Sequence, residues 1–327
     1  MNEEFVRKVE LLIEQVENAE TEKLSELAKI ADLNLDKDLV GVDLSGEDLS
    51  NDDLRNANLR NANLRNANLR NANLSDANLS GADLSGADLS GAFLIGADLN
   101  GTKINDETKL DFKWRTVWKI VNQPEAIRNL SDIDLSGADL SNANLRSVNL
   151  SRAFLMDADL MDADLMDADL SGAFLIGVKI NDETKLDSKW RKVWEIVNQG
   201  AEGQDLSGID LSNAYLSKAN LRSVNLSNAN LNGANLKSVN LSNANLNGAN
   251  LKSARLYSAN LRGASLVQAS LYYSYLFGAD LTDADLSGAT VANASFGYNQ
   301  GISEIMKRDL VSKGATFQDS LGIPVKL

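Results

Sequence analysis

The chain has 327 residues, a formal net charge of −14, and neither cysteine nor histidine. These absences exclude a thiol nucleophile, a disulfide framework, and the commonest general base and metal ligand. No apolar run is long enough for a membrane helix, and the N-terminus lacks the basic-then-apolar order of a signal peptide. We therefore expect a cytoplasmic protein that does not span a membrane. Its acidic surface should also repel nucleic acid.

Residues 1–40 predict an N-terminal helical cap. Residues 2–18 have the apolar spacing of one helical face, at Phe5, Val9, Leu12, Ile13 and Val16. A second short helix is expected at about 21–31, with Leu24, Leu27 and Ala28 turned inward.

From residue 41 the dominant signal is an apolar residue, usually leucine, at every fifth position. It extends over three runs, at 41–104, 130–180 and 206–297, with thirteen, eleven and nineteen such positions. A period of five matches neither the 3.6-residue helix nor the two-residue strand. The period therefore predicts a repeat architecture.

The composition of the five-residue unit suggests how it folds. A typical unit is Ala-Asp-Leu-Ser-Gly at 82–86, with only alanine and leucine apolar. If each unit forms one short side and then bends by about 90°, four units make one coil. Leucine then points to the axis, alanine packs near a corner, and glycine or asparagine lies where the backbone turns. Glu47 and Asp52 stand at alanine positions, so the first coil should be irregular or partly covered by the N-terminal helices.

The units Ala-Asn-Leu-Arg-Asn at 57–61 and Ala-Asp-Leu-Ser-Gly at 82–86 resemble the A(D/N)LXX repeats of the pentapeptide-repeat family. The insertions and the C-terminal segment are similar to those of cyanobacterial members. The resemblance implies an all-β solenoid, a right-handed quadrilateral β-helix. To it we add N- and C-terminal helical caps and two helical insertions. The 43 units would form about eleven coils and a tube on the order of 50 Å long.

Two near-copies interrupt the repeat, as predicted helical insertions at 105–129 and 181–205. Residues 105–123 and 181–199 agree at sixteen of nineteen positions. Each helix should start after an N-cap aspartate, Asp111 or Asp187, and stop at Pro124 or Gly200. Each has an apolar face, made of Trp114, Val117, Trp118 and Val121, or of Trp190, Val193, Trp194 and Val197.

Two interpretations of these helices stay open. They can pack on the tube wall, or they can form a ledge on which Trp114, Trp118, Trp190 and Trp194 bind a partner. We expect both helices to leave from the same side of the tube. This holds if Leu110 and Leu186 each complete a unit after a one-residue bulge, because three whole coils then separate the helices; without those units they would leave from adjacent sides.

Residues 298–327 predict a C-terminal helical cap. Ile302, Ile305, Met306 and Leu310 have helical spacing before a Lys313-Gly314 stop signal. Residues 315–317 could add one last strand.

Positions twenty apart should stack on one side of the tube, which turns the sequence into a surface map. Late in the tube this map gathers an aromatic patch, with Tyr257 stacked on Phe277 and Arg255 on Tyr275, next to Tyr272 and Tyr273. The patch can bind a protein partner, dock the C-terminal segment or mediate self-association. Phe154 and Phe174 form a smaller patch. Met156, Met161 and Met166 form an outward belt, for which expansion of one repeated unit is the simpler explanation.

No catalytic, cofactor-binding or metal-binding residue is predicted. The serines are at repeat positions without a histidine to activate them, and the aspartates point from different sides. The predicted function is a non-enzymatic scaffold or regulator with an unknown protein partner, as a monomer or as an end-to-end or side-by-side homodimer. The alternative, taken from the resemblance, is a DNA-mimicking regulator of gyrase. That alternative needs continuous negative charge, yet residues 205–296 hold five acidic and six basic residues.

Overall fold

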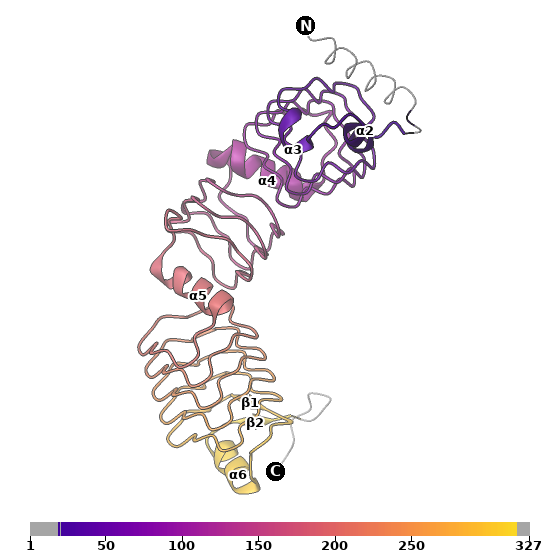
Figure 1. Ribbon diagram of the computed structural model, residues 1–327. Helices are drawn as coiled ribbons and strands as arrows, with labels where there is room; N and C mark the ends of the chain where they lie inside the picture. Colours follow the sequence, from indigo (N-terminus) through magenta and orange to yellow (C-terminus); the bar gives the residue numbers. More distant parts are fainter. Residues whose placement is uncertain (1–18, 20, 319–327) are drawn as a thin grey trace, which may run out of the picture.

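The computed structural model describes residues 19 and 21–318, and the chain forms a β-helix with four short sides per coil (Figure 1). Parallel bridges join residues twenty apart, as in Asn58 to Asn78 and Asn78 to Asp98. Each five-residue unit is therefore one side of the coil. The helix predicted at 2–18 and the end of the C-terminal cap at 319–327 lie outside the described residues.

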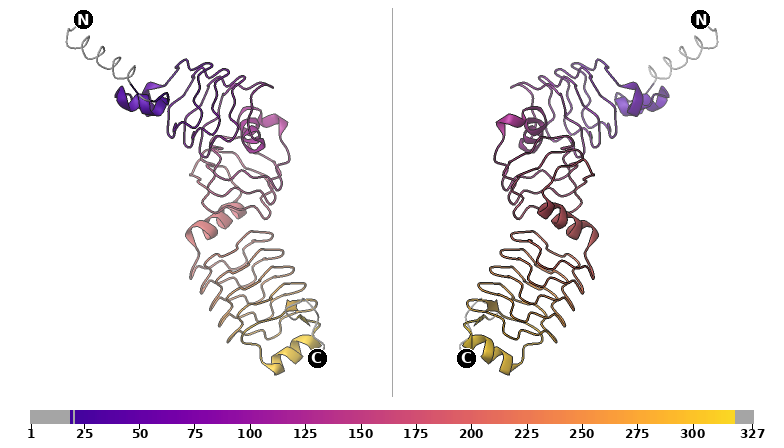
Figure 2. Two further views of the ribbon diagram at one scale, coloured as in Figure 1. Left: turned by 90° about the vertical axis from the view of Figure 1, so that its right-hand side faces the viewer. Right: turned by 90° about the vertical axis from the view of Figure 1, so that its left-hand side faces the viewer.

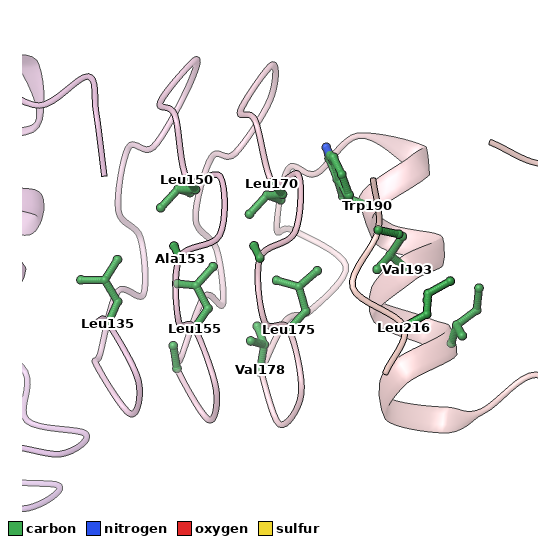
Figure 3. Close-up of a cluster of buried hydrophobic side chains, with 14 of the residues drawn as sticks. Leu135, Leu150, Ala153, Leu155, Leu170, Leu175, Val178, Trp190, Val193 and Leu216 are labelled. Atoms are coloured by element: carbon green, nitrogen blue, oxygen red, sulfur yellow. The ribbon is translucent and has the colours of Figure 1, made fainter. Parts of the chain in front are cut away.

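The core is a file of leucines along the axis. Figure 3 shows Leu135, Leu155 and Leu175 in line from one coil to the next. Leu160 is only 2% exposed, and the alanine beside it, Ala158, is fully buried. Burial of one leucine contributes about 1.5–3 kcal/mol, so the file can hold the tube together without disulfides.

The polar positions of the unit stabilise its bend. The corner residue has a left-handed backbone, with φ of 57° at Asn61 and 75° at Gly86, which asparagine and glycine tolerate best. The residue before leucine is Asp or Asn because its side-chain oxygen accepts the N–H two positions later. Asp43 accepts in this way from Ser45 at 3.0 Å. The repeat pattern alone indicates only that this position faces solvent.

Two helices, α2 (Leu24–Ile30) and α3 (Leu35–Asp38), lie at the N-terminal mouth of the tube (Figure 1). Asp52 is buried beneath α2 and accepts hydrogen bonds from the backbone N–H and the hydroxyl of Ser25. The acid at this alanine position thus satisfies a donor in the first turn of α2. The first coil is partly covered, as the sequence suggested.

The insertions contain α4 (Phe112–Asn122), followed by the short 3₁₀ helix η1 (Pro124–Ala126), and α5 (Ser188–Gln199). Asp111 and Asp187 occupy the N-cap positions, but neither side chain makes a capping hydrogen bond. The predicted N-cap positions are right. Both helices lie where one run of coils meets the next (Figure 2).

At both junctions, consecutive runs contact each other over one half of the tube's cross-section, and a helix separates them over the other half. Gly96 N–H donates to the Gly137 carbonyl at 2.7 Å, and Gly172 N–H donates to the Asn213 carbonyl at 2.8 Å. A helix is about 10 Å across, whereas coils are about 4.8 Å apart. The tube therefore bends at α4 and α5, as Figure 2 shows.

The two helices leave from adjacent sides of the tube, so the same-side expectation was wrong. The one-residue bulge does exist, because Lys109 pairs with Asp88 and Lys185 with Asp164, each at a separation of 21 residues. However, Gly96 N–H donates to the Gly137 carbonyl, so the next units, those of Asp98 and Asp139, share one side, and Asp159 pairs with Asp139 on it. Asp88 lies two units before Asp98, and Asp164 lies one unit after Asp159. Because a coil has four sides, these offsets place Asp88 and Asp164 on adjacent sides.

The C-terminal end adds a final piece of sheet. β1 (Ser295–Phe296) pairs in parallel with β2 (Thr316–Phe317), and α6 (Glu304–Ser312) lies between them in the chain. The Ser303 hydroxyl caps α6 by accepting from Met306 N–H at 3.2 Å.

Asp139 at the first junction provides a stability test. Burial raises its pKa, and the nearby Asp98 and Asp159 add to the effect. A raised folded-state pKa means that stability falls as pH rises through the ordinary and then the raised value. Asp139→Asn keeps the acceptor for Ser141 and should add on the order of 0.5 kcal/mol at pH 7 in urea unfolding, with no gain at pH 3.

Asp280→Asn is the matched control. The Thr282 hydroxyl is the main cause of a lowered pKa at Asp280, with a smaller contribution from Arg262. The charged form of Asp280 therefore stabilises the fold above the ordinary carboxyl pKa, and its removal should bring no gain at pH 7. Equal effects of the two variants would contradict the junction geometry.

Candidate interaction surface

One side of the tube carries aromatic residues across the second junction. Phe154 and Phe174 pair in neighbouring coils, and their rings stack with centroids 4.6 Å apart. The ring of Tyr215, the first aromatic of the next run, lies 4.1 Å from that of Phe174. We call Phe154, Phe174 and Tyr215 the aromatic ladder. It is continuous although α5 and the rest of an insertion separate Phe174 from Tyr215 in the sequence.

A groove of ≈ 400 Å³ follows the ladder along the tube. Its small corner residues are Gly172, Asn213 and Gly233, and Asn235 and Arg255 extend the aromatic side. The ladder therefore borders a shallow channel that crosses several coils.

The two arginines of the groove differ in their partners. Arg152 makes two hydrogen bonds to Asp132, each of 2.6 Å, and these lower the pKa of Asp132. Arg255 forms no ion pair with any residue in the described part of the chain. One cationic group thus stays free beside the ladder in a strongly acidic protein.

The late aromatic patch exists, and its ring contacts run between neighbouring columns as well as along them. Arg255 and Tyr275 are bridge partners as expected. The Tyr257 ring contacts Tyr275 at 5.7 Å, whereas Phe277 makes an edge contact with Tyr298 at 5.3 Å. Tyr257 and Phe277 are still at equivalent positions on neighbouring coils, because Ser258 N–H donates to the Phe277 carbonyl at 3.0 Å.

Four tyrosines of this patch are at least one third exposed: Tyr257, Tyr272, Tyr273 and Tyr275. Tyr272 and Tyr273 pack against each other at 6.3 Å. Burial, with a smaller contribution from Tyr275, raises the pKa of Tyr257. Tyr275 lies on the same side as the ladder, because bridges join Tyr215 through Asn235 and Arg255 to Tyr275, whereas Tyr272 lies on the preceding side.

The tryptophans of α4 and α5 are turned toward the tube. Trp114 and Trp190 are 7% and 6% exposed, and Figure 3 shows Trp190 and Val193 facing the coils. Trp118 donates its indole N–H to the Thr102 carbonyl at 2.9 Å, and Trp194 donates to the Val178 carbonyl at 2.7 Å. This placement argues against a ledge built on Trp114 and Trp190, and it leaves only part of Trp118 and Trp194 accessible.

Other surface features give no further site. Met156 and Met161 are exposed and Met166 is half-buried, so the methionine belt exists. Among the described residues, no group of three or more acidic side chains is arranged to hold a metal ion. Within the same part of the chain, no helix has the length and apolar character to cross a membrane.

Solved structures of several repeat proteins are similar to this chain. A protein from the thylakoid lumen of Arabidopsis thaliana is 26% identical over 38% of this chain and 86% of its own, with a TM-score of 0.35. HetL from Nostoc sp. strain PCC 7120, involved in heterocyst differentiation regulation, is 27% identical over 84% and 94%, with a TM-score of 0.24. QnrB1, a plasmid-mediated fluoroquinolone resistance protein, is 17% identical over 88% and 99%, also at 0.24.

A comparison with curated proteins gives no match. The family model described as pentapeptide repeats matches eight copies, over residues 38–76, 67–106, 129–162, 147–182, 202–233 and 234–271. These ranges cover more than half of the sequence and include units from all three runs. The chain belongs to the pentapeptide-repeat family, whose fold is a right-handed β-helix.

Proposed function

We propose that the protein is a non-enzymatic scaffold that binds a protein partner along its aromatic ladder. The observation that carries this proposal is the stack of Phe154, Phe174 and Tyr215. Aromatic side chains at solvent-facing repeat positions are unexpected, since Asp or Asn there would hydrogen-bond the turn. Aromatic residues and arginine are also the types most enriched at the centres of protein interfaces.

The form of the groove favours an elongated binding segment. The groove extends across several coils, from Arg152 to Arg255. The ring edges offer apolar contact along its length, and the free guanidinium of Arg255 offers a position for an acidic side chain. The exposed Tyr275 extends the same side toward the C-terminal end.

A consensus-restoring variant tests the proposal without disturbing the fold. Phe154→Asn, Phe174→Asn and Tyr215→Asn together place the usual repeat residue at each position. We expect the variant to keep its circular dichroism spectrum and to lose, in quantitative pull-downs from the native cell extract, the proteins that the wild type enriches. Phe93→Asn, which removes an aromatic outside the groove that is 57% exposed, is the matched control and should retain them. Retention of the same partners by the triple variant would overturn the proposal.

The alternative function, DNA mimicry directed at gyrase, fits the surface less well. Basic side chains neutralise acidic ones between coils, as in Arg65 with Asp83 and Arg146 with Asp164. A DNA mimic needs uninterrupted negative charge along the tube. We therefore expect no inhibition of gyrase supercoiling at micromolar protein, and clear inhibition would reverse the order of the two functions.

Further parts of the proposal concern the ends and the location of the protein. We propose that α2, α3 and α6 act as caps, because they cover part of each tube mouth, where unpaired strand edges would otherwise invite aggregation. The cytoplasmic location remains a prediction from the sequence.

A further inference from the structure

The last coil of the tube has an open edge. In the preceding coil, Leu266 N–H donates to the Asp285 carbonyl at 2.7 Å and Gln268 N–H donates to the Ser287 carbonyl at 2.9 Å. One coil later, the N–H groups of Leu286, Gly288 and Val291 have no acceptor among the described residues. Beside α6 a cavity of ≈ 590 Å³ borders this edge, lined by Leu286, Gly288 and Ile305 among others.

This open edge is arranged like the end of the first run and the end of the second run, as each would look without the run that follows it. Gly96, Gly172 and Gly288 are at equivalent corners, because each lies the same number of residues before the helix that follows it, α4, α5 or α6. Gly96 and Gly172 each donate to the first coil of the following run, whereas Gly288 has no such partner among the described residues. Among the described residues, the Gly288 corner is therefore equivalent to the two docking corners but carries no coil.

The start of the first run has the sequence of a coil that docks. Residues 42–46 read Val-Asp-Leu-Ser-Gly, and the docked coils begin Ile-Asp-Leu-Ser-Gly at 133–137 and Ile-Asp-Leu-Ser-Asn at 209–213. The corner glycine of the docked coil, Gly137, packs so closely on Ile95 that a Cβ added to it would lie only 2.9 Å from the isoleucine side chain. A Cβ added to the equivalent Gly46 would meet nothing within 4 Å among the described residues.

The acidic residue of the motif shows the same difference. Asp134 pairs with Lys113 of α4 at 3.3 Å, and Asp210 pairs with Lys189 of α5 at 3.0 Å. The equivalent Asp43 is hydrogen-bonded to Ser45 and Asn63 of its own run. The first coil thus has the features of a docking coil without a run beneath it.

The shape of the edge restricts what can bind there. Leu286 and Val291 lie on two sides that meet at the Gly288 corner, so a straight strand could pair with only one of them. A coil that turns at the same corner can dock through the corner N–H alone, as at Gly96 and Gly172, where the N–H groups of the flanking leucines also have no acceptor among the described residues. We infer that the C-terminal edge binds the first coil of a second copy of this chain, head to tail. This surface is separate from the aromatic ladder, and the inference does not depend on the proposed partner.

Cysteine cross-linking tests this inference directly, because the chain has no cysteine of its own. By analogy with Phe174 and Tyr215, whose rings meet across the second junction, the head-to-tail contact should place Asp48 over Thr290. Both residues are exposed at repeat positions that accept many side chains. Asp48→Cys and Thr290→Cys are made as two separate proteins, mixed over a concentration series, and oxidised.

We expect a disulfide-linked dimer of twice 35.3 kDa only in the mixture, at a yield that rises with concentration. The double variant should give a ladder of higher multiples. Asp169→Cys, an exposed mid-tube position of the same kind, is the control and should not link to Asp48→Cys. Dimers of Thr290→Cys alone would show tail-to-tail pairing, and no link at any concentration would show no end contact; either result overturns the inference.

Discussion

Leu160→Asp should abolish the folding of the second run. The Leu160 side chain is buried on the axis, and its N–H donates to the Lys179 carbonyl at 2.9 Å. An aspartate there would place an unpaired carboxylate among leucines, where no hydrogen-bond donor is available. We expect a loss of more than about 5 kcal/mol in the free energy of unfolding of this run.

Hydrogen exchange with mass spectrometry measures this effect locally. Amides of residues 130–180 should lose protection, while coils of the third run, which contact only their neighbours, should keep most of theirs. Leu160→Ala is the control and should cost about 2–5 kcal/mol because it removes packing without adding charge. Similar protection in Leu160→Asp and wild type would show that Leu160 does not line a dry core.

A one-residue insertion should be far more damaging than a five-residue insertion at the same place. After Gly233, one extra glycine shifts every later leucine of the third run off the axis, whereas Ala-Asn-Leu-Asn-Gly adds one complete side. The first change exposes leucines that contribute about 1.5–3 kcal/mol each, so the coils after the insertion should unfold. The second should change the melting temperature little.

Circular dichroism and thermal melting of the two insertion variants measure this difference. The five-residue variant also controls for simple disruption of the corner, because both insertions interrupt the chain at Gly233. Equal tolerance of the two variants would contradict the rule that each unit makes one quarter turn.

The regular part of the fold could be predicted from the sequence because a single short rule repeats. An apolar residue at every fifth position leaves few ways to bury Leu84, Leu89 and Leu94 together, and all three are buried. The one-residue bulge before Leu110 was also predictable, since it preserves the inward direction of the leucines. The domain boundaries of the runs stay predictions.

The junctions could not be predicted, because they depend on contacts between segments that follow no repeat. The prediction of the helix directions counted five-residue units and assumed that every unit adds a new side to the coil. The second run stacks on the first at Gly96 and Gly137, and this places a unit after the insertion on a side that the first run already occupies. The predicted directions of the helices were therefore wrong. For the same reason the sequence map linked Phe154 with Phe174 but missed Tyr215, which is 41 positions from Phe174 rather than twenty.

The sequence left two interpretations open where exposure depends on packing. The spacing of Trp114 and Trp118 indicates an amphipathic helix, but does not tell whether its apolar face meets the tube or a partner. The buried Trp114 and the hydrogen bond from Trp118 to Thr102 show that the face meets the tube. A repeat of aromatic residues at Asp or Asn positions was the stronger signal.

The continuity of one side across the junctions underlies both the ladder and the end-to-end contact. Phe174→Cys with Tyr215→Cys tests it within a single chain, since the ring centroids of these residues lie 4.1 Å apart. On oxidation of dilute protein, we predict an intramolecular disulfide and no free thiol, as for the neighbouring-coil pair Asn225→Cys with Asn245→Cys. Two persistent thiols in the first variant, with complete oxidation of the second, would contradict the stacking of run upon run.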